Sequence, residues 1–305
     1  GGPNPAMHFQ TDGMGESERG GDIVITANGG LETRHATVQR DIRLRGRRIR
    51  IDQSGDPTNN AALNTPTGDV LLEFWNRYED QNLRLGGGGA ETFFSADGSR
   101  LTNASLERIR ADAGDLTIFG SNFNSNDVSR RTGLNIELRG VDAQAVDGIA
   151  GDIRLTATYR VSNTGWNRGQ NRYNAQIGGG VRLQNGQAND FGDHSVYIWA
   201  QQDVALGNAG SSISVGDGHG LAIQAGVRHR GMTLENATGL ENSYRHATGR
   251  VAGAGTLSAD YLYVASVFEG IGNASTPVTV DASHLWLENI DQGHRDHNNA
   301  PGGLF

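Results

Sequence analysis

The chain has 305 residues, a formal net charge of −8 and 36% apolar residues, with 45 glycines and no cysteine. The modest net charge and regularly clustered apolar residues exclude a disordered chain, and the lack of cysteine excludes disulfides and thiolate metal sites. No apolar run approaches the roughly 18 residues of a membrane-spanning helix, so we expect no direct membrane insertion. The chain starts Gly1-Gly2-Pro3 without a signal peptide, and we expect a processed product or a segment of something larger.

The predicted elements are almost all short strands, because apolar residues recur at period two. Residues 1–20 are polar and glycine-rich and predict an arm or cap, residues 21–290 the folded body, and residues 291–305 a polar tail. We expect a polar loop at 53–68, and only 101–113 has the spacing of a short helix. The predicted strands contain Ile23/Ile25, Ile42/Leu44, Ile49/Ile51, Val70–Phe74, Leu83/Leu85, Leu106/Ile109, Leu116/Ile118, Ile136/Leu138, Ile153/Leu155, Val181/Leu183, Val196/Ile198, Val204/Leu206, Ile213/Val215, Leu221/Ile223, Met232/Leu234, Leu257, Leu262/Val264, Val278/Val280 and Leu285/Leu287.

One phrase, Gly-Asp followed by alternating apolar residues, recurs along the chain. It is clearest at 151–157 (Gly-Asp-Ile-Arg-Leu-Thr-Ala) and at 21–27. Glycine can take positive φ at a sharp corner, and aspartate can accept hydrogen bonds from nearby backbone N–H groups in an Asx-turn. We therefore predict that these pairs are corners of a structural repeat, and that stacked aspartates form a ladder. The predicted corners are Gly21, Asp22, Gly68, Asp69, Gly114, Asp115, Gly151, Asp152, Gly192 and Asp193.

Three all-β architectures compete for this pattern. A sandwich requires regular hairpin turns, but the loops vary too much in length. A propeller fits the phrase spacing, but the strands are very short and no aromatic blade signature recurs. Short strands, glycine corners, loop inserts and a thin apolar interior favour a right-handed parallel β-helix with a unit of about 20 residues.

Two stretches resemble a known family. The Gly-Asp-Ile-x-Leu-Thr-Ala phrases, together with 253–262 and 270–282, are similar to repeats of filamentous-haemagglutinin-type exoproteins. These are bacterial β-helical adhesins exported by two-partner secretion or as autotransporters. The resemblance implies a secreted or cell-surface, extracellular rod used for adhesion or for displaying another domain. The chain departs from the family in its polar inserts at 159–176 and 238–252 and lacks the amino-terminal secretion-domain signature.

Three clusters are candidate binding sites. Trp166, Arg168, Arg172 and Tyr173 lie in the insert, where exposed aromatic side chains suit a sugar ring or a neighbouring protein, although the insert could simply fold onto its own repeat. The arginines that alternate through 40–51 could bind a polyanion, but a solvated strand face explains them better, and an acidic chain argues against nucleic acid. His219 and the His294, Asp296 and His297 cluster have side chains that zinc or nickel could use as ligands, but clustering in a polar tail is little evidence for a site, so we expect no metal and no cofactor.

The carboxylates stand singly in turns, and no catalytic motif is present. We expect a non-enzymatic adhesin segment or the subunit of a self-assembling surface fibre, with a glycan or a protein on another surface as partner and homo-oligomer or end-to-end filament formation. The alternative is a β-helical polysaccharide lyase or hydrolase, or a tailspike-like depolymerase, which would require a cleft with convergent carboxylates.

Overall fold

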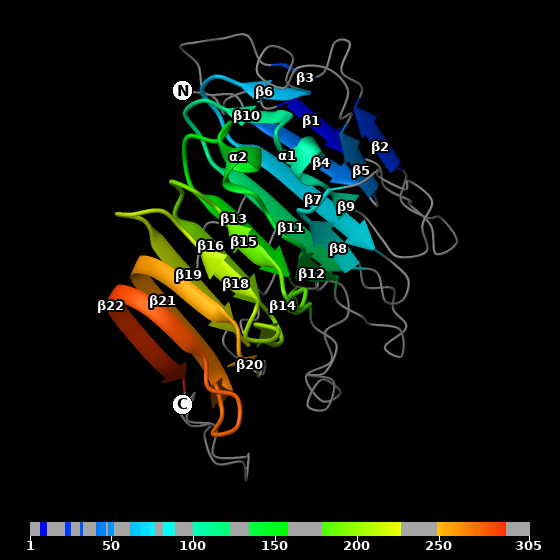
Figure 1. Cartoon of the computed structure of the whole chain (residues 1–305). Coiled ribbons are helices and arrows are strands. Elements are labelled where there is room, and N and C mark those ends of the chain that lie inside the picture. The colour runs from blue at the N-terminus through cyan, green and yellow to red at the C-terminus, as the bar shows by residue number, and fades with distance from the viewer. Residues whose placement is uncertain are drawn as a thin grey trace.

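The computed structural model describes residues 7–10, 22–25, 31–32, 41–46, 48–51, 62–76, 82–88, 100–122, 134–157, 179–226 and 249–290. These residues form a mostly β structure with a large parallel sheet and almost no helix. Every strand pairing among them is parallel, and the strands lie side by side in a long row from β1 to β22 (Figure 1).

The longest series of pairings, which we call the main ladder, joins nine strands of the described chain. In pairing order they are β1 (Met7–Gln10), β4 (Ile42–Gly46), β7 (Val70–Asn76), β11 (Leu116–Asn122), β13 (Ile153–Ala157), β16 (Val196–Ala200), β19 (Gly220–Ala225), β21 (Thr256–Ile271) and β22 (Thr279–Ile290). This order is also their order along the sequence. Strands must therefore return to the same edge after each pass.

The chain leaves the main ladder between successive strands and enters two further groups. The second ladder contains β8 (Asn82–Leu85), β12 (Asn135–Leu138), β14 (Val181–Leu183), β17 (Val204–Ala205), β20 (Gly249–Ala252) and the end of β21, with β9 (Arg100–Leu101) beside β8. A separate three-stranded sheet contains β3 (Leu31–Glu32), β6 (Leu63–Thr65) and β10 (Ile109–Ala111). The third group, in the large sheet, contains β15 (Ala188–Asp190), β18 (Ser212–Ser214) and the starts of β21 and β22. A separate pair joins β2 (Asp22–Ile25) to β5 (Arg48–Ile51).

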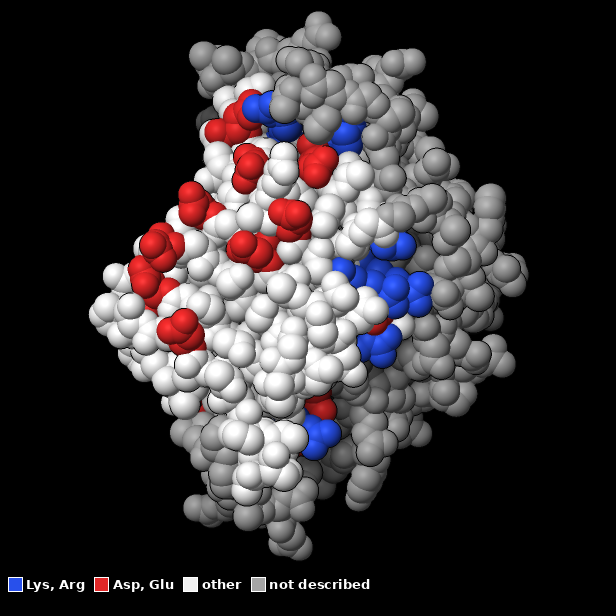
Figure 2. Space-filling view, viewed as in Figure 1, with Lys and Arg blue, Asp and Glu red and all other residues white. Residues whose placement is uncertain are grey.

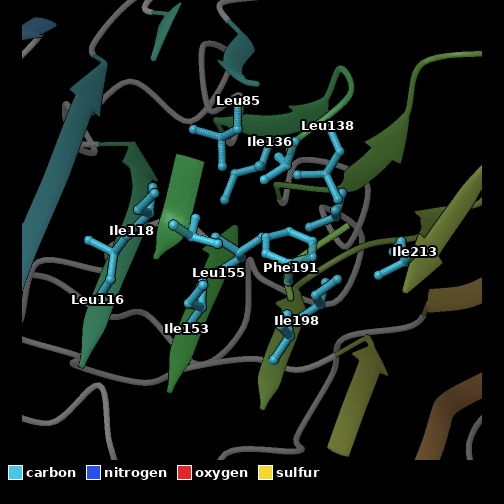
Figure 3. Close-up of a cluster of buried hydrophobic side chains, with 14 of the residues drawn as sticks. Leu85, Leu116, Ile118, Ile136, Leu138, Ile153, Leu155, Phe191, Ile198 and Ile213 are labelled. Atoms are coloured by element: carbon cyan, nitrogen blue, oxygen red, sulfur yellow. The ribbon is translucent and has the colours of Figure 1, made fainter. Parts of the chain in front are cut away.

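The core lies between these groups of strands. Residues that are register partners on successive strands of the main ladder form a line across the strands, which we call a column. The first column contains Ile42, Val70, Leu116, Ile153, Val196, Leu221 and Leu262, and the second contains Leu44, Leu72, Ile118, Leu155, Ile198, Ile223 and Val264; all are buried. Figure 3 shows five of these side chains, those of Leu116, Ile118, Ile153, Leu155 and Ile198, on the side of the core opposite Leu85, Ile136 and Leu138 of the second ladder, with the Phe191 ring among them.

Most predicted strands are confirmed, and the exceptions have physical reasons. The predicted helix at 101–113 is only α1 (Asn103–Leu106), begun by the Thr102 side chain, which accepts from the Ser105 N–H. Ile109 belongs instead to β10, because the backbone there pairs with β6. A second short helix, α2 (Ala143–Val146), was not predicted. The Met232/Leu234 pair lies outside the described residues.

Three further expectations need correction. The predicted polar loop at 53–68 contains β6, whose Leu63 is buried. β21 and β22 have 16 and 12 residues, although the sequence pattern predicted short strands throughout. The number of residues between stacked aspartates is also larger than the expected unit of about 20. Asp69 and Asp115 are 46 residues apart, and Asp115 and Asp152 are 37 residues apart. The separations are unequal because the connections that leave the main ladder between these residues differ in length.

Candidate functional site: an aspartate ladder, an arginine cluster and an open end

Three of the five predicted corner aspartates, Asp69, Asp115 and Asp152, form a continuous hydrogen-bonded ladder with Asp41 beside the main ladder. The Asp69 N–H donates to Asp41 Oδ1 (3.1 Å), the Asp115 N–H donates to Asp69 Oδ1 (2.9 Å), and the Asp152 N–H donates to Asp115 Oδ1 (2.7 Å). Each carboxylate thus accepts from the backbone of the next strand rather than from its own turn. The local Asx-turn expected from the sequence is replaced by a long-range contact.

The glycines of the phrase serve close approach rather than the positive φ that the sequence suggested. Of the four described phrase glycines, only Gly192 has positive φ (56°). A Cβ on Gly114 would overlap the carbonyl oxygen of Gly68, and a Cβ on Gly151 would overlap Asp115 Oδ1 and lie 2.8 Å from the Gly114 oxygen. Glycine is therefore required because the backbones and the carboxylates touch at this corner.

Charge in the aspartate ladder is only partly balanced. The Arg154 guanidinium bonds both Asp115 Oδ2 and Asp152 Oδ2 and lies 5.5 Å from the Tyr197 ring centroid. Burial raises the pKa of Asp69, and the nearby carboxylates of Asp115 and Asp41 raise it further. Burial and the Asp115 charge likewise raise the pKa of Asp152.

These carboxylates are committed to structure. Asp41, Asp69 and Asp115 each use Oδ1 to hold the next backbone N–H, and Asp115 and Asp152 use Oδ2 for Arg154. No group of three or more His, Cys, Asp or Glu side chains in the described chain is arranged to hold a metal ion. The arrangement can align strands, because each bond fixes the register of one strand on the next.

A second cluster lies on the second ladder, where three arginines share one carboxylate. Glu137 Oε2 lies 3.6 Å from Arg84 Nε, 3.2 Å from an Arg139 nitrogen and 3.3 Å from an Arg182 nitrogen. Burial raises the pKa of Glu137, but hydrogen bonds and charge from Arg139 and Arg182 outweigh burial and lower it overall. In Figure 2 the largest group of arginine atoms lies over β8 and β12, with smaller groups near the top and the bottom, whereas most acidic atoms lie along the left and upper part of that face.

The third feature is the end of the row at β22. The large apolar side chains that remain exposed in the described chain all lie on β21 and β22: Tyr261, Val280, Leu285, Trp286 and Leu287. Tyr261 and His284 stack with ring centroids 4.8 Å apart and planes within 12° of parallel, and His284 and Trp286 are 6.2 Å apart and within 15°. We call this set of six residues the terminal face. Leu285 and Leu287 continue the buried columns of β21, whereas Tyr261, His284 and Trp286 lie on the opposite side of these strands.

The contact residues predicted from the sequence fall outside the described residues: Trp166, Arg168, Arg172 and Tyr173. The same holds for the predicted histidine cluster of His294, Asp296 and His297. Gly21 also falls outside, and Asp22 is the first residue of β2. In the arginine run, Ile42, Leu44, Ile49 and Ile51 are buried and Arg43 pairs with Asp41 (3.0 Å). His219 is partly exposed beside Asp217 and Gly218.

The sequence missed the terminal face for a clear reason. Val280, Leu285 and Leu287 have the same alternation as every buried strand, so they were predicted as ordinary strand positions. They are exposed because no further strand of the described chain covers their columns, and that information is not in the local pattern.

Comparison with protein-family models, curated proteins and solved structures finds no match to this chain. Within the described part of the chain, no helix has the length and hydropathy needed to cross a bilayer. Functional inference therefore rests on the geometry of the described residues.

Proposed function

We propose that the chain is a right-handed parallel β-helix that serves as a non-enzymatic rod on or outside a bacterial cell. The order in which the chain visits its strands supports this winding: β6, β7 and β8 are followed by β10, β11 and β12, and later β15, β16 and β17 by β18, β19 and β20. Parallel strands joined by crossover connections are almost always right-handed. The resemblance of 151–157, 253–262 and 270–282 to filamentous-haemagglutinin-type repeats favours the same architecture.

The aspartate ladder is the observation that carries the non-enzymatic proposal. A glycoside-cleaving site needs two carboxylates about 5 to 9 Å apart facing a substrate. Here the aspartates face one another's backbones, with Asp115 Oδ1 only 2.7 Å from the Asp152 nitrogen. Their role is to join successive turns of the rod, so the chain acts as an adhesin segment or as the subunit of a surface fibre.

The mechanism is mechanical and multivalent. A stiff rod holds its inserts at fixed spacing, and many weak contacts with a glycan or a protein on another surface add through avidity. The inserts near Trp166 and Tyr173 are the proposed contact elements.

A polysaccharide-cleavage screen tests the non-enzymatic proposal against the depolymerase alternative. Purified protein is incubated with neutral, acidic and sulfated polysaccharides, and product is followed by reducing ends and by absorbance of unsaturated uronates. We expect the wild type to release no more product than an Asp115→Asn control. We also expect the immobilised protein to bind glycan or host-cell surface material that is free of bacteria and to retain it on washing. Cleavage that Asp115→Asn abolishes, with the protein still folded, would overturn the proposal.

A further inference from the structure

The buried columns of the main ladder run out at β22. Leu285 is the register partner of Leu262, and Leu287 is the partner of Val264. Leu262 and Val264 are fully buried, whereas Leu285 is 42% and Leu287 is 39% exposed. Val280, the partner of fully buried Leu257, is 38% exposed. The residues that precede Leu285 and Leu287 in their columns from β4 to β21 are buried, so these two columns are uncovered on the last strand, as is Val280 beside Leu257.

The edge of β22 that faces away from β21 has no partner strand among the described residues. β22 pairs with β21 along most of its length, and no other described strand pairs with it. It is 12 residues long and contains no proline, a residue that commonly protects an edge strand. The outer edge of a strand beside exposed leucines is a template for one more parallel strand.

The opposite end of the main ladder supplies a matching strand. β1 pairs with β4 so that Met7 lies opposite Ile42 and Phe9 opposite Leu44. Met7 and Phe9 therefore occupy the same two columns that end at Leu285 and Leu287. Among the described residues, β1 has no other pairing partner. Among the described residues, both ends of this parallel ladder therefore lack a further partner strand, and they share the same strand direction and have apolar residues in the same columns.

We propose that β22 of one copy pairs in parallel with β1 of a second copy, Leu285 opposite Met7 and Leu287 opposite Phe9. This inference rests on the proposed rod, whose ladder it continues across the junction. The alternate residues also match: His8 falls in the column of Trp286, and Gln10 in the column of Glu288, so that no like charges meet. The junction is head-to-tail, and such contacts do not close at two subunits, so the product is a filament.

Complementary end mutants test the junction. Leu287→Glu places a charge in the β22 half, and Met7→Glu places one in the β1 half. Sedimentation velocity over a range of concentrations, with negative-stain electron microscopy, measures assembly. We expect the wild type to form linear filaments and each mutant alone to stay monomeric at concentrations at least about tenfold higher, because an unpaired buried charge opposes the contact. Mixed together, the two mutants should form 1:1 dimers that grow no further, since each keeps one intact end. The control variant Ala205→Glu adds a charge at the exposed residue of β17 and should assemble like the wild type.

Circular dichroism and the cleavage screen separate the possible failures. Folded, β-rich, inactive monomers of the wild type at all concentrations would overturn the junction and leave the rod intact. Assembly that appears only after residues 291–305 are removed would also overturn it, and would identify that segment as the occupant. Filaments that Leu287→Glu and Met7→Glu do not affect would place the contact elsewhere. Compact particles that cleave polysaccharide would overturn the proposed function itself.

Discussion

The Asp115 N–H donates to Oδ1 of Asp69, 46 residues earlier, across 2.9 Å. This bond joins two repeats of one phrase and depends on the acceptor oxygen rather than on the charge. Asp69→Ala leaves the Asp115 N–H without its acceptor and should lower the free energy of unfolding by about 1 kcal/mol. Asp69→Asn keeps Oδ1 and should retain most of the stability in urea unfolding. Equal losses in both variants would mean that the charge is what matters.

Because the pKa of Asp69 is raised, the stability of the wild type and that of Asp69→Asn should depend differently on pH. Because the folded-state pKa of Asp69 lies above the ordinary value of 3.8, protonation of Asp69 favours folding, and its contribution to stability is present at low pH and lost as pH rises through the folded pKa. Asp69→Asn should therefore be at least as stable as the wild type at pH 7. The difference should shrink as the pH falls toward 4. Thermal unfolding at both pH values measures this trend, and a difference that grows at low pH would contradict it.

The stacked glycines should tolerate no side chain. Alanine at Gly114 would overlap the Gly68 carbonyl oxygen, so we expect Gly114→Ala to cost about 1–3 kcal/mol through overpacking. Gly88→Ala is the matched control, because a Cβ there meets nothing within 4 Å and the φ is not positive. The control should be neutral in thermal unfolding. A Gly114→Ala protein as stable as the wild type would show that the corner can relax.

Glu137 should contribute stability with the opposite pH sign to Asp69. Its pKa is lowered below the ordinary value of 4.5, so its contribution to stability is present above that pH and is lost as pH falls through the folded pKa. Glu137→Gln removes a charge shared by Arg84, Arg139 and Arg182 and should cost about 2 kcal/mol at pH 7. The cost should diminish below pH 4. Arg250→Gln, which breaks only the exposed pair with Asp203, is the control and should change stability little.

Arg108 is a buried cation whose removal should stabilise the fold. Its side chain is 1% exposed, and its three guanidinium nitrogens have no hydrogen-bond partner among the described residues. Replacing a buried ion by an apolar residue of similar volume is often stabilising by about 1–4 kcal/mol. Arg108→Met should therefore raise the unfolding midpoint. A lowered midpoint would show that the guanidinium is paired and that its partner stabilises the chain.

The sequence predicted the main ladder well, because Leu116/Ile118 and Ile153/Leu155 alternate with outward residues as strands do. The sequence pattern missed β6 and β15, because the side chains that these strands bury are partly polar in β6 and wholly polar in β15. Asn189 of β15 is fully buried, and its Oδ1 accepts from the Gly140 and Val141 N–H groups while Nδ2 donates to the Ser212 carbonyl. A polar residue that replaces an apolar one in the core in this way leaves no hydrophobic period to detect.

The candidate sites were less predictable, because each depends on which residues the winding brings together. Glu137 and Arg182 are 45 positions apart, and Asp115 and Arg154 are 39 apart, at spacings that no motif fixes. The repeated Gly-Asp phrase did indicate stacked corners. Its glycines, however, were explained by φ, whereas the structure explains those at 114 and 151 by the lack of space for a Cβ.

An engineered disulfide tests most directly whether successive turns of the chain stack in register. Ala205 and Ala252 are register partners on neighbouring parallel strands, so their Cα atoms should lie about 4.8 Å apart, within disulfide range. Because the chain has no cysteine, Ala205→Cys with Ala252→Cys introduces the single possible pair. We expect complete cross-linking under mild oxidation, seen as a mobility shift on a non-reducing gel. Arg182→Cys with Ala252→Cys, two strands apart in the same column, should stay reduced. Cross-linking of the second pair but not the first would contradict the stacked ladder and the rod built on it.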